Sequence, residues 1–126
     1  MTQKERHELY TKCCNLSSKY WAIRDEKPLD DPDKQKNLLE AIRGFKEIEK
    51  HYECTAWEFY WVVSKTYEAL DDLQNSYEYI KIAHKKNPTH VEVLREIAFL
   101  ALMLEKYDEA AYYAQKNVEF NDDDPT

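Results

Sequence analysis

Apolar residues recur at three- and four-residue steps along much of the chain. The spacing is clearest in two neighbouring segments, at Tyr60, Val63, Tyr67 and Leu70 and then at Leu73, Tyr77, Ile80 and Ala83. Such a spacing places the apolar side chains on one face of an α-helix. Pro88 follows the second segment, and proline cannot continue a helix. The two segments therefore predict a pair of helices that form a hairpin.

The segment after Pro88 repeats this pattern at a distance of 34 residues. The matched pairs are Tyr60 with Leu94, Val63 with Ile97, Ser64 with Ala98, Leu73 with Tyr107, and Ser76 with Ala110. Two of the pairs consist of small residues, which allow two helices to cross at short distance. The chain therefore contains an internal repeat, and its small residues are expected where the helices of each hairpin cross.

The repeat resembles that of the tetratricopeptide family, whose pattern is W-x2-L-G-x2-Y, then A-x3-F, then P. The first copy reads Tyr60-x2-Val63-Ser64-x2-Tyr67, Ser76-x3-Ile80 and Pro88. The second copy reads Leu94-x2-Ile97-Ala98-x2-Ala101 and Ala110-x3-Ala114, with Asp122 at the proline position. Its YDEA stretch, from Tyr107 to Ala110, is similar to the family's turn between helices. The resemblance implies an all-α fold of stacked antiparallel helical hairpins in a right-handed superhelix, with repeats at 57–90 and 91–124.

Residues 1–54 fit the repeat less closely. Ala41-x3-Phe45 resembles the second helix of a repeat, and Tyr10-x2-Cys13-Cys14-x2-Ser17 is the candidate for its first helix. A polar, proline-containing stretch at 27–33 predicts an inserted loop between them. We therefore expect a single domain over residues 1–126, with helices at 3–26, 34–51, 55–71, 73–87, 89–105 and 107–121. A plain helical bundle is the alternative.

Composition and charge narrow the classes of function. The chain has one glycine, Gly44, among 126 residues, which favours helices over hairpin turns and phosphate-binding loops. Its net charge of −7 repels nucleic acids and anionic lipids, so neither is expected as a partner. The sequence has no segment of the roughly 20 apolar residues that span a membrane and no apolar signal region at its start. We expect a cytoplasmic protein whose three cysteines are reduced thiols.

The sequence contains no recognisable catalytic or cofactor motif. Phosphate-binding loops and nucleophile elbows depend on several glycines. His51 and Cys54, with Glu47 or Glu53, are the best candidates for metal ligands, but their spacing matches no zinc motif, and a capped helix end is the simpler interpretation. We therefore expect no enzymatic activity, no cofactor and no bound metal.

The resemblance also implies where a partner would bind. In such superhelices, the first helix of each repeat lines the concave face. The candidate residues of this groove are Trp61, Val62, Lys65, Arg95, Phe99 and Met103. Apolar residues rimmed by charges are typical of a site for an apolar peptide or helix. The alternative is that the N-terminal helix or its loop covers this strip and makes it part of the core.

Some members of the family hold the C-terminal tails of chaperones with a clamp of Lys, Asn and Arg. The matching positions here are Val62, Glu92 and Glu96. Two acids and a valine do not attract a terminal carboxylate, so this type of ligand is not expected.

We expect a non-catalytic adaptor or scaffold that binds another protein or a peptide segment in its groove. The alternative is an acidic stoichiometric inhibitor or immunity-type protein that masks a basic partner. The chain stops soon after its sixth predicted helix, without the polar capping helix that repeat arrays normally have. The residues left without a cover are Ala111, Val118 and Phe120. They predict self-association, as a homodimer, through this end.

Overall fold

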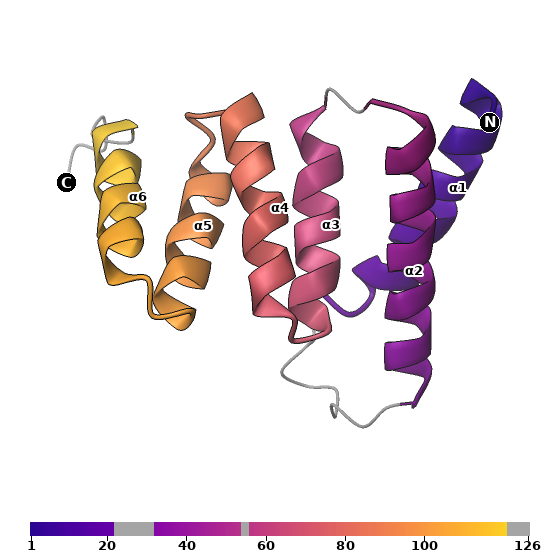
Figure 1. Ribbon diagram of the computed structural model, residues 1–126, viewed down its shortest axis with the longest axis horizontal. Coiled ribbons are helices and arrows are strands. Elements are labelled where there is room, and N and C mark those ends of the chain that lie inside the picture. Colours follow the sequence, from indigo (N-terminus) through magenta and orange to yellow (C-terminus); the bar gives the residue numbers. More distant parts are fainter. Residues whose placement is uncertain (22–31, 54–55, 121–126) are drawn as a thin grey trace. The chain divides into compact units, whose positions relative to one another are not determined.

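The computed structural model describes residues 1–21, 32–53 and 56–120 (Figure 1). Within these ranges the secondary structure consists of helices and turns, without strands. The helices are α1 (Gln3–Ser18), α2 (Pro32–His51), α3 (Trp57–Ala69), α4 (Leu73–Lys86), α5 (Val91–Met103) and α6 (Tyr107–Phe120). The predicted all-α fold of six helices is confirmed for the described part of the chain, and the bounds of α2 to α6 lie within two residues of those predicted.

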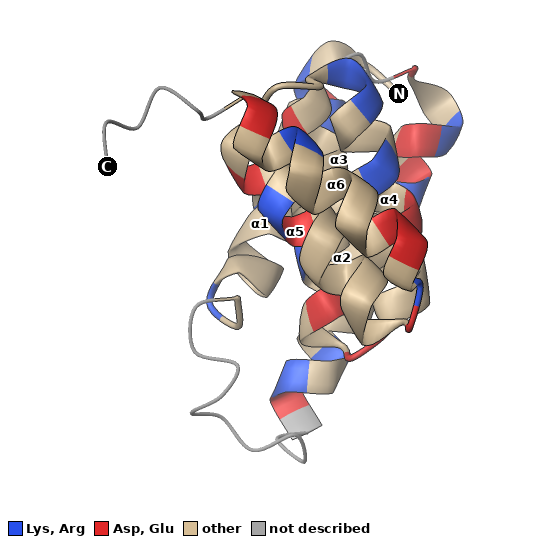
Figure 2. Cartoon of the chain, turned by 90° about the vertical axis from the view of Figure 1, so that its left-hand side faces the viewer, with Lys and Arg blue, Asp and Glu red and all other residues tan. Residues whose placement is uncertain are grey.

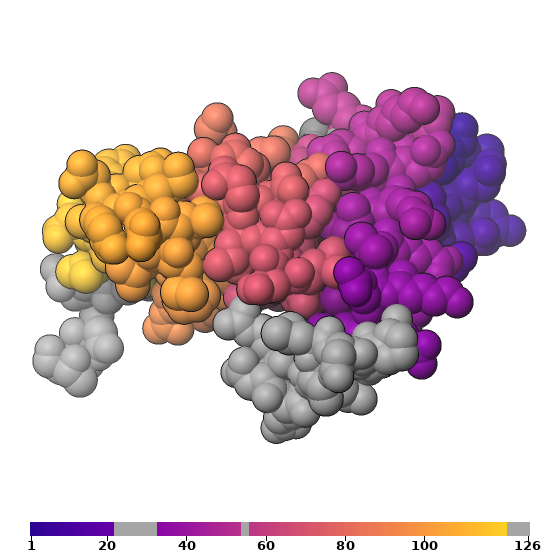
Figure 3. Space-filling model, turned by 60° about the horizontal axis from the view of Figure 1, so that its bottom comes forward, coloured from indigo at the N-terminus to yellow at the C-terminus, as the bar shows by residue number. Residues whose placement is uncertain are grey.

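The helices belong to two compact units that share α3. Residues 1–55 and 65–72 form the first unit, and residues 56–64 and 73–126 form the second. In the first unit α1 packs against α2. In the second unit α5 packs against both α4 and α6, and Figure 3 shows these three helices as one closely packed group. Each unit is therefore built around a helical hairpin, whereas the single domain and the superhelix remain predictions.

The first helix is shorter than predicted. Thr2 and Glu5 start it with a capping box, in which each side chain bonds the other residue's backbone amide. The helix was expected to run to residue 26, but it ends at Ser18, and the amides of Tyr20 and Trp21 donate to carbonyls three residues back. This part of the prediction was wrong because the buried Tyr20 packs against α2 and α3 from a turn.

The start of α2 also differs from the prediction. Residues 27–31 of the predicted loop lie outside the described residues, as do residues 22–26 of the predicted first helix. Pro32 and Asp33, which were expected to end the loop, instead belong to the first turn of α2. Proline suits this position because the first amides of a helix have no partner within it, and an acidic residue there favours the helix dipole.

The only glycine of the chain lies where α1 and α2 touch. A Cβ atom at Gly44 would overlap the Sγ of Cys13 and would lie 3.3 Å from the Cδ1 of Leu9. The glycine therefore allows the two helices to approach closely. Burial raises the pKa of the Cys13 thiol to about 11, so this thiol stays protonated and unreactive near neutral pH.

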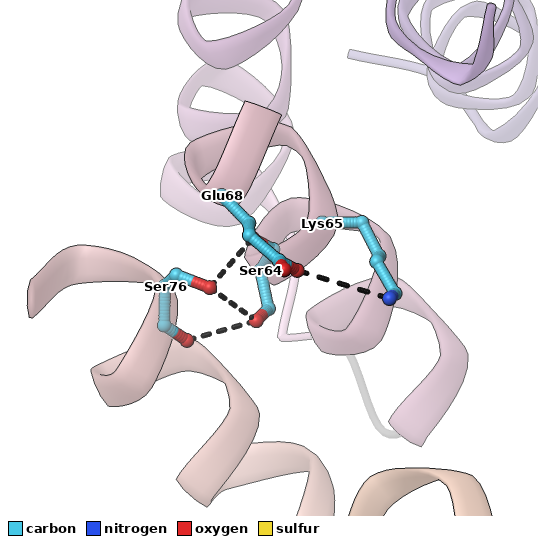
Figure 4. A network of polar contacts seen from close by, with 4 residues as sticks. All are labelled: Ser64, Lys65, Glu68 and Ser76. Atoms are coloured by element: carbon cyan, nitrogen blue, oxygen red, sulfur yellow. Dashed lines mark hydrogen bonds and ion pairs between the residues drawn. The ribbon is translucent and has the colours of Figure 1, made fainter. Parts of the chain in front are cut away.

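The crossing of α3 and α4 in the second unit is built on two buried serines. Figure 4 shows their hydroxyl groups facing each other, with the oxygen atoms 2.9 Å apart. The Ser64 hydroxyl also donates to the backbone carbonyl of Ser76 at 2.8 Å, and the Ser76 hydroxyl to that of Ser64 at 2.9 Å. Ser64 and Ser76 thus form the close crossing that their small side chains predict.

The 34-residue period of the sequence is also present in the backbone. After α3 and after α5, the chain closes the helix with the same pair of hydrogen bonds, a Schellman motif. The bonds are Asp72 to Tyr67 and Asp71 to Glu68 and, 34 residues later, Lys106 to Ala101 and Glu105 to Leu102. Asp71 and Glu105 accordingly have positive φ angles of 63° and 61°. The two turns are therefore built alike, although each has a charged residue where glycine is usual.

Replacing Glu105 with glycine is expected to raise the free energy of unfolding by roughly 0.5–1 kcal/mol. A left-handed backbone strains any residue that has a Cβ, whereas glycine adopts it freely, although it loses more entropy on folding. Urea denaturation followed by circular dichroism measures the change. Glu105→Ala is the control, because it removes the carboxylate but keeps the Cβ. A glycine variant no more stable than the alanine variant would contradict the prediction.

Candidate protein-binding surface

Helix α5 carries apolar residues on two opposite sides. Its buried side forms part of the core of the second unit, with Val93, Leu94, Ile97, Leu100 and Ala101. Its other side exposes three large apolar side chains, Phe99 at 40%, Leu102 at 52% and Met103 at 52%. Large apolar side chains that are exposed side by side usually mark an interaction site. We name Phe99, Leu102 and Met103 the α5 strip, and it is the best candidate for contact with another molecule.

The charged residues beside the α5 strip lie on the same side of the helix. Arg95, Phe99 and Met103 follow one another at four-residue steps, so their side chains project from one face. Arg95 is exposed and its Nη1 lies 3.4 Å from the Oε1 of Glu92. An exposed ion pair of this kind stabilises the fold very little. Both charges are therefore available to interact with a partner.

The other predicted groove residues lie on α3 and are less exposed. Val62 is only 7% exposed and packs in the core, so its assignment to an open groove was wrong. Trp61 is half-buried. Lys65 is half-buried as well, and its Nζ lies 3.7 Å from the Oε2 of Glu68, one turn further along α3 (Figure 4). Of the predicted groove residues, Arg95, Phe99 and Met103 are thus the ones with openly exposed side chains, and Leu102 joins them.

Helix α6 leaves a second apolar face uncovered. None of its residues is fully buried, and Tyr107, Ala111 and Val118 are exposed at helical spacing. Phe120, at the end of the helix, is exposed too. Residues 110–115 contain no charge, and in Figure 2, which faces α6, this middle part of the helix is tan. Ala111, Val118 and Phe120 are therefore exposed as expected, while self-association through them stays a prediction.

A partly buried hydrogen bond and an aromatic contact hold the inner side of α6. The fully buried Tyr77 of α4 donates its hydroxyl hydrogen to the Oε1 of Glu109 at 3.0 Å. Burial, followed by the hydrogen bond to Glu109, raises the pKa of the Tyr77 hydroxyl. The ring of His84 meets the ring of Tyr113 edge-on at 5.3 Å, and burial lowers the pKa of His84. Helix α6 is thus fixed on α4 through residues of its inner face.

The described residues offer no arrangement suited to metal binding. Among them, no group of three or more His, Cys, Asp and Glu side chains is close enough to hold an ion. His51 Nε2 lies 2.9 Å from the Oε1 of Glu47, one turn apart on the exposed end of α2. Cys54, the other residue of the predicted metal candidate, lies outside the described residues. In the same part of the chain, the helices are too short or too polar for any of them to cross a membrane.

No protein-family model matches this chain, and no curated protein has significant sequence similarity to it. The resemblance to tetratricopeptide repeats therefore depends on the spacing of the residues themselves. The likeness of the two Schellman turns, also 34 residues apart, is a structural counterpart of that spacing.

Proposed function

We propose that this chain is a non-catalytic protein-binding module of the tetratricopeptide type, which holds an apolar peptide or helix on the α5 strip. The observation that carries the proposal is the exposure of Phe99, Leu102 and Met103 on a helix whose opposite side is core. Complete burial of one such side chain contributes about 1.5–3 kcal/mol. Two or three of them seated in a partner's surface are sufficient to form the centre of an interface.

The chemistry of the surface indicates the kind of partner. Phe99 offers a rigid aromatic anchor, and Met103 a flexible side chain that adapts to irregular surfaces. An amphipathic helix with apolar residues at three- and four-residue steps would match the spacing of the α5 strip. Glu92 and Glu96 lie on the same helix, and the chain has a net charge of −7. Basic residues that flank the apolar segment would therefore favour binding and its orientation.

The proposal is tested with peptides selected from a random display library on the wild-type protein. The variant Phe99→Ser/Met103→Ser is expected to bind the selected peptides at least about 30-fold more weakly, because two central apolar contacts of roughly 1 kcal/mol or more each are lost. Fluorescence anisotropy measures Kd. Leu39→Ser is the matched control, since Leu39 of α2 is 41% exposed and lies in the other unit. Circular dichroism checks that all three proteins are equally helical.

Salt dependence separates this function from that of an acidic inhibitor. Because apolar contacts on the α5 strip contribute most of the affinity, and basic flanking residues only a minor part, Kd is expected to rise only modestly from low to high salt. A surface that masks a basic partner predicts a steep loss of association rate as salt rises. Equal binding by the wild type and the double variant, together with steep salt dependence, would contradict the α5 strip and favour the acidic inhibitor.

A further inference from the structure

The first unit contains a cavity of about 210 Å³ that is partly open to solvent and has a buried lysine in its wall. Its lining residues are Lys34, Gln35 and Leu38 of α2, and Ala69, Leu70 and Asp71 at the end of α3. The Lys34 side chain is 3% exposed, and its Nζ has no hydrogen-bond partner among the described residues. Taking an ammonium group out of water is costly unless a negative charge or several acceptors compensate it. An anionic group bound beside Lys34 would provide this compensation.

The position of Lys34 on α2 also favours an anionic group. Lys34 is the third residue of a 20-residue helix, where the helix dipole presents its positive end. Anions bind at such termini, and the buried ammonium adds a full charge to the partial charges of the backbone. The Lys34 ammonium and the N-terminal end of α2 therefore both favour a negatively charged ligand group at this site.

The other walls of the cavity determine the rest of the ligand. Leu38 and Ala69 are buried, and they belong to an apolar cluster that Leu70 packs against. Asp71 and Gln35 are exposed and lie at the rim. The Asp71 carboxylate would repel a doubly charged phosphate more strongly than a singly charged group. The lining is therefore suited to one carboxylate with an aliphatic remainder.

We propose that this cavity binds a small aliphatic monocarboxylate, with its carboxylate on the Lys34 ammonium and its alkyl chain against Leu38, Ala69 and Leu70. A dry cavity of roughly 150 Å³ can hold benzene. The volume here, about 210 Å³, thus suits an acid of about four to seven carbons. The site lies in the first unit and is independent of the function proposed for α5.

Pentanoate is the probe, and pentanamide, which has the same shape without the charge, is its control. At about tenfold excess over its Kd, pentanoate is expected to raise the Tm of the wild type by roughly 4 °C, while pentanamide and phosphate leave it unchanged. Lys34→Met should weaken pentanoate binding by about tenfold or more, because the charged contact is lost. Lys36→Met, which removes an exposed lysine from the same helix, should bind as the wild type does. Isothermal titration calorimetry measures the affinities.

Several results would overturn the proposal. Pentanamide or phosphate that binds as well as pentanoate would exclude monocarboxylate selectivity, and unchanged pentanoate binding by Lys34→Met would exclude the lysine. Without ligand, Lys34→Met should be at least as stable as the wild type, since it removes an uncompensated buried charge. A marked loss of stability would show that the protein itself provides the partner of Lys34. The methyl resonances of Leu38 and Leu70 should shift when pentanoate is added to the wild type, and unshifted resonances would place the ligand elsewhere.

Discussion

The variant Gly44→Ala is expected to lower the free energy of unfolding by about 2 kcal/mol, although alanine is the better helix former by about 1 kcal/mol. The new Cβ would overlap the Sγ of Cys13, which is buried between α1 and α2. Inserting a methyl group into such a contact costs up to about 3 kcal/mol, because the helices must separate or the thiol must leave its rotamer. Urea denaturation monitored by circular dichroism measures the difference.

A second background tests whether Cys13 is the cause. In Cys13→Ala the Sγ is gone, and a Cβ at position 44 would lie 3.8 Å from the Cβ of residue 13 and 3.3 Å from the Cδ1 of Leu9, a side-chain end that needs to shift by only a few tenths of an ångström. There, Gly44→Ala should be neutral or should stabilise the protein through its helix propensity. The two substitutions should therefore show strong coupling in a double-mutant cycle. An equal loss of stability in both backgrounds would mean that overlap with the Cys13 thiol is not the reason why position 44 needs a glycine.

Much of this fold is predictable because apolar spacing is a local signal. The helices from α2 onward follow it to within two residues at each end. The end of α1 does not, since Tyr20 and Trp21 continue the apolar pattern but lie in a turn. Tyr20 is buried because it packs with Leu38 and Ala69, which are distant in the sequence. Periodicity reports that a residue is buried, but it cannot report whether a helix or a turn brings it there.

The binding surface was predictable only in part, for a related reason. The register of the repeat predicts which side chains point away from the core of their hairpin. For Phe99 and Met103 this prediction agrees with the observed exposure. Val62 follows the same rule but is only 7% exposed, so the register of one hairpin does not by itself decide whether a side chain is exposed. The burial of Lys34 had no signal in the sequence, since lysine is almost always exposed.

The largest loss of stability is expected for Ser64→Leu, at about 4 kcal/mol. Ser64 and Ser76 are both buried, and their hydroxyl groups fill the short distance between α3 and α4 (Figure 4). A leucine at position 64 must push the helices apart, and this also separates the Ser76 hydroxyl from the Ser64 carbonyl that accepts its hydrogen. Overpacking and an unsatisfied buried hydroxyl each cost roughly 1–3 kcal/mol. Chemical denaturation of the purified variant measures the total loss in free energy of unfolding.

Alanine substitutions separate the effect of size from that of hydrogen bonding. Ser64→Ala should cost about 1 kcal/mol, because the Ser76 hydroxyl keeps the Ser64 carbonyl as its acceptor. Ser64→Ala/Ser76→Ala should cost less than the sum of the two single changes, since it leaves no buried hydroxyl without its partner. The second repeat has alanines at the matching positions, Ala98 and Ala110, which agrees with this expectation. Strictly additive losses would show that the two hydroxyls act independently, and a mild effect of Ser64→Leu would show that the crossing is not closely packed.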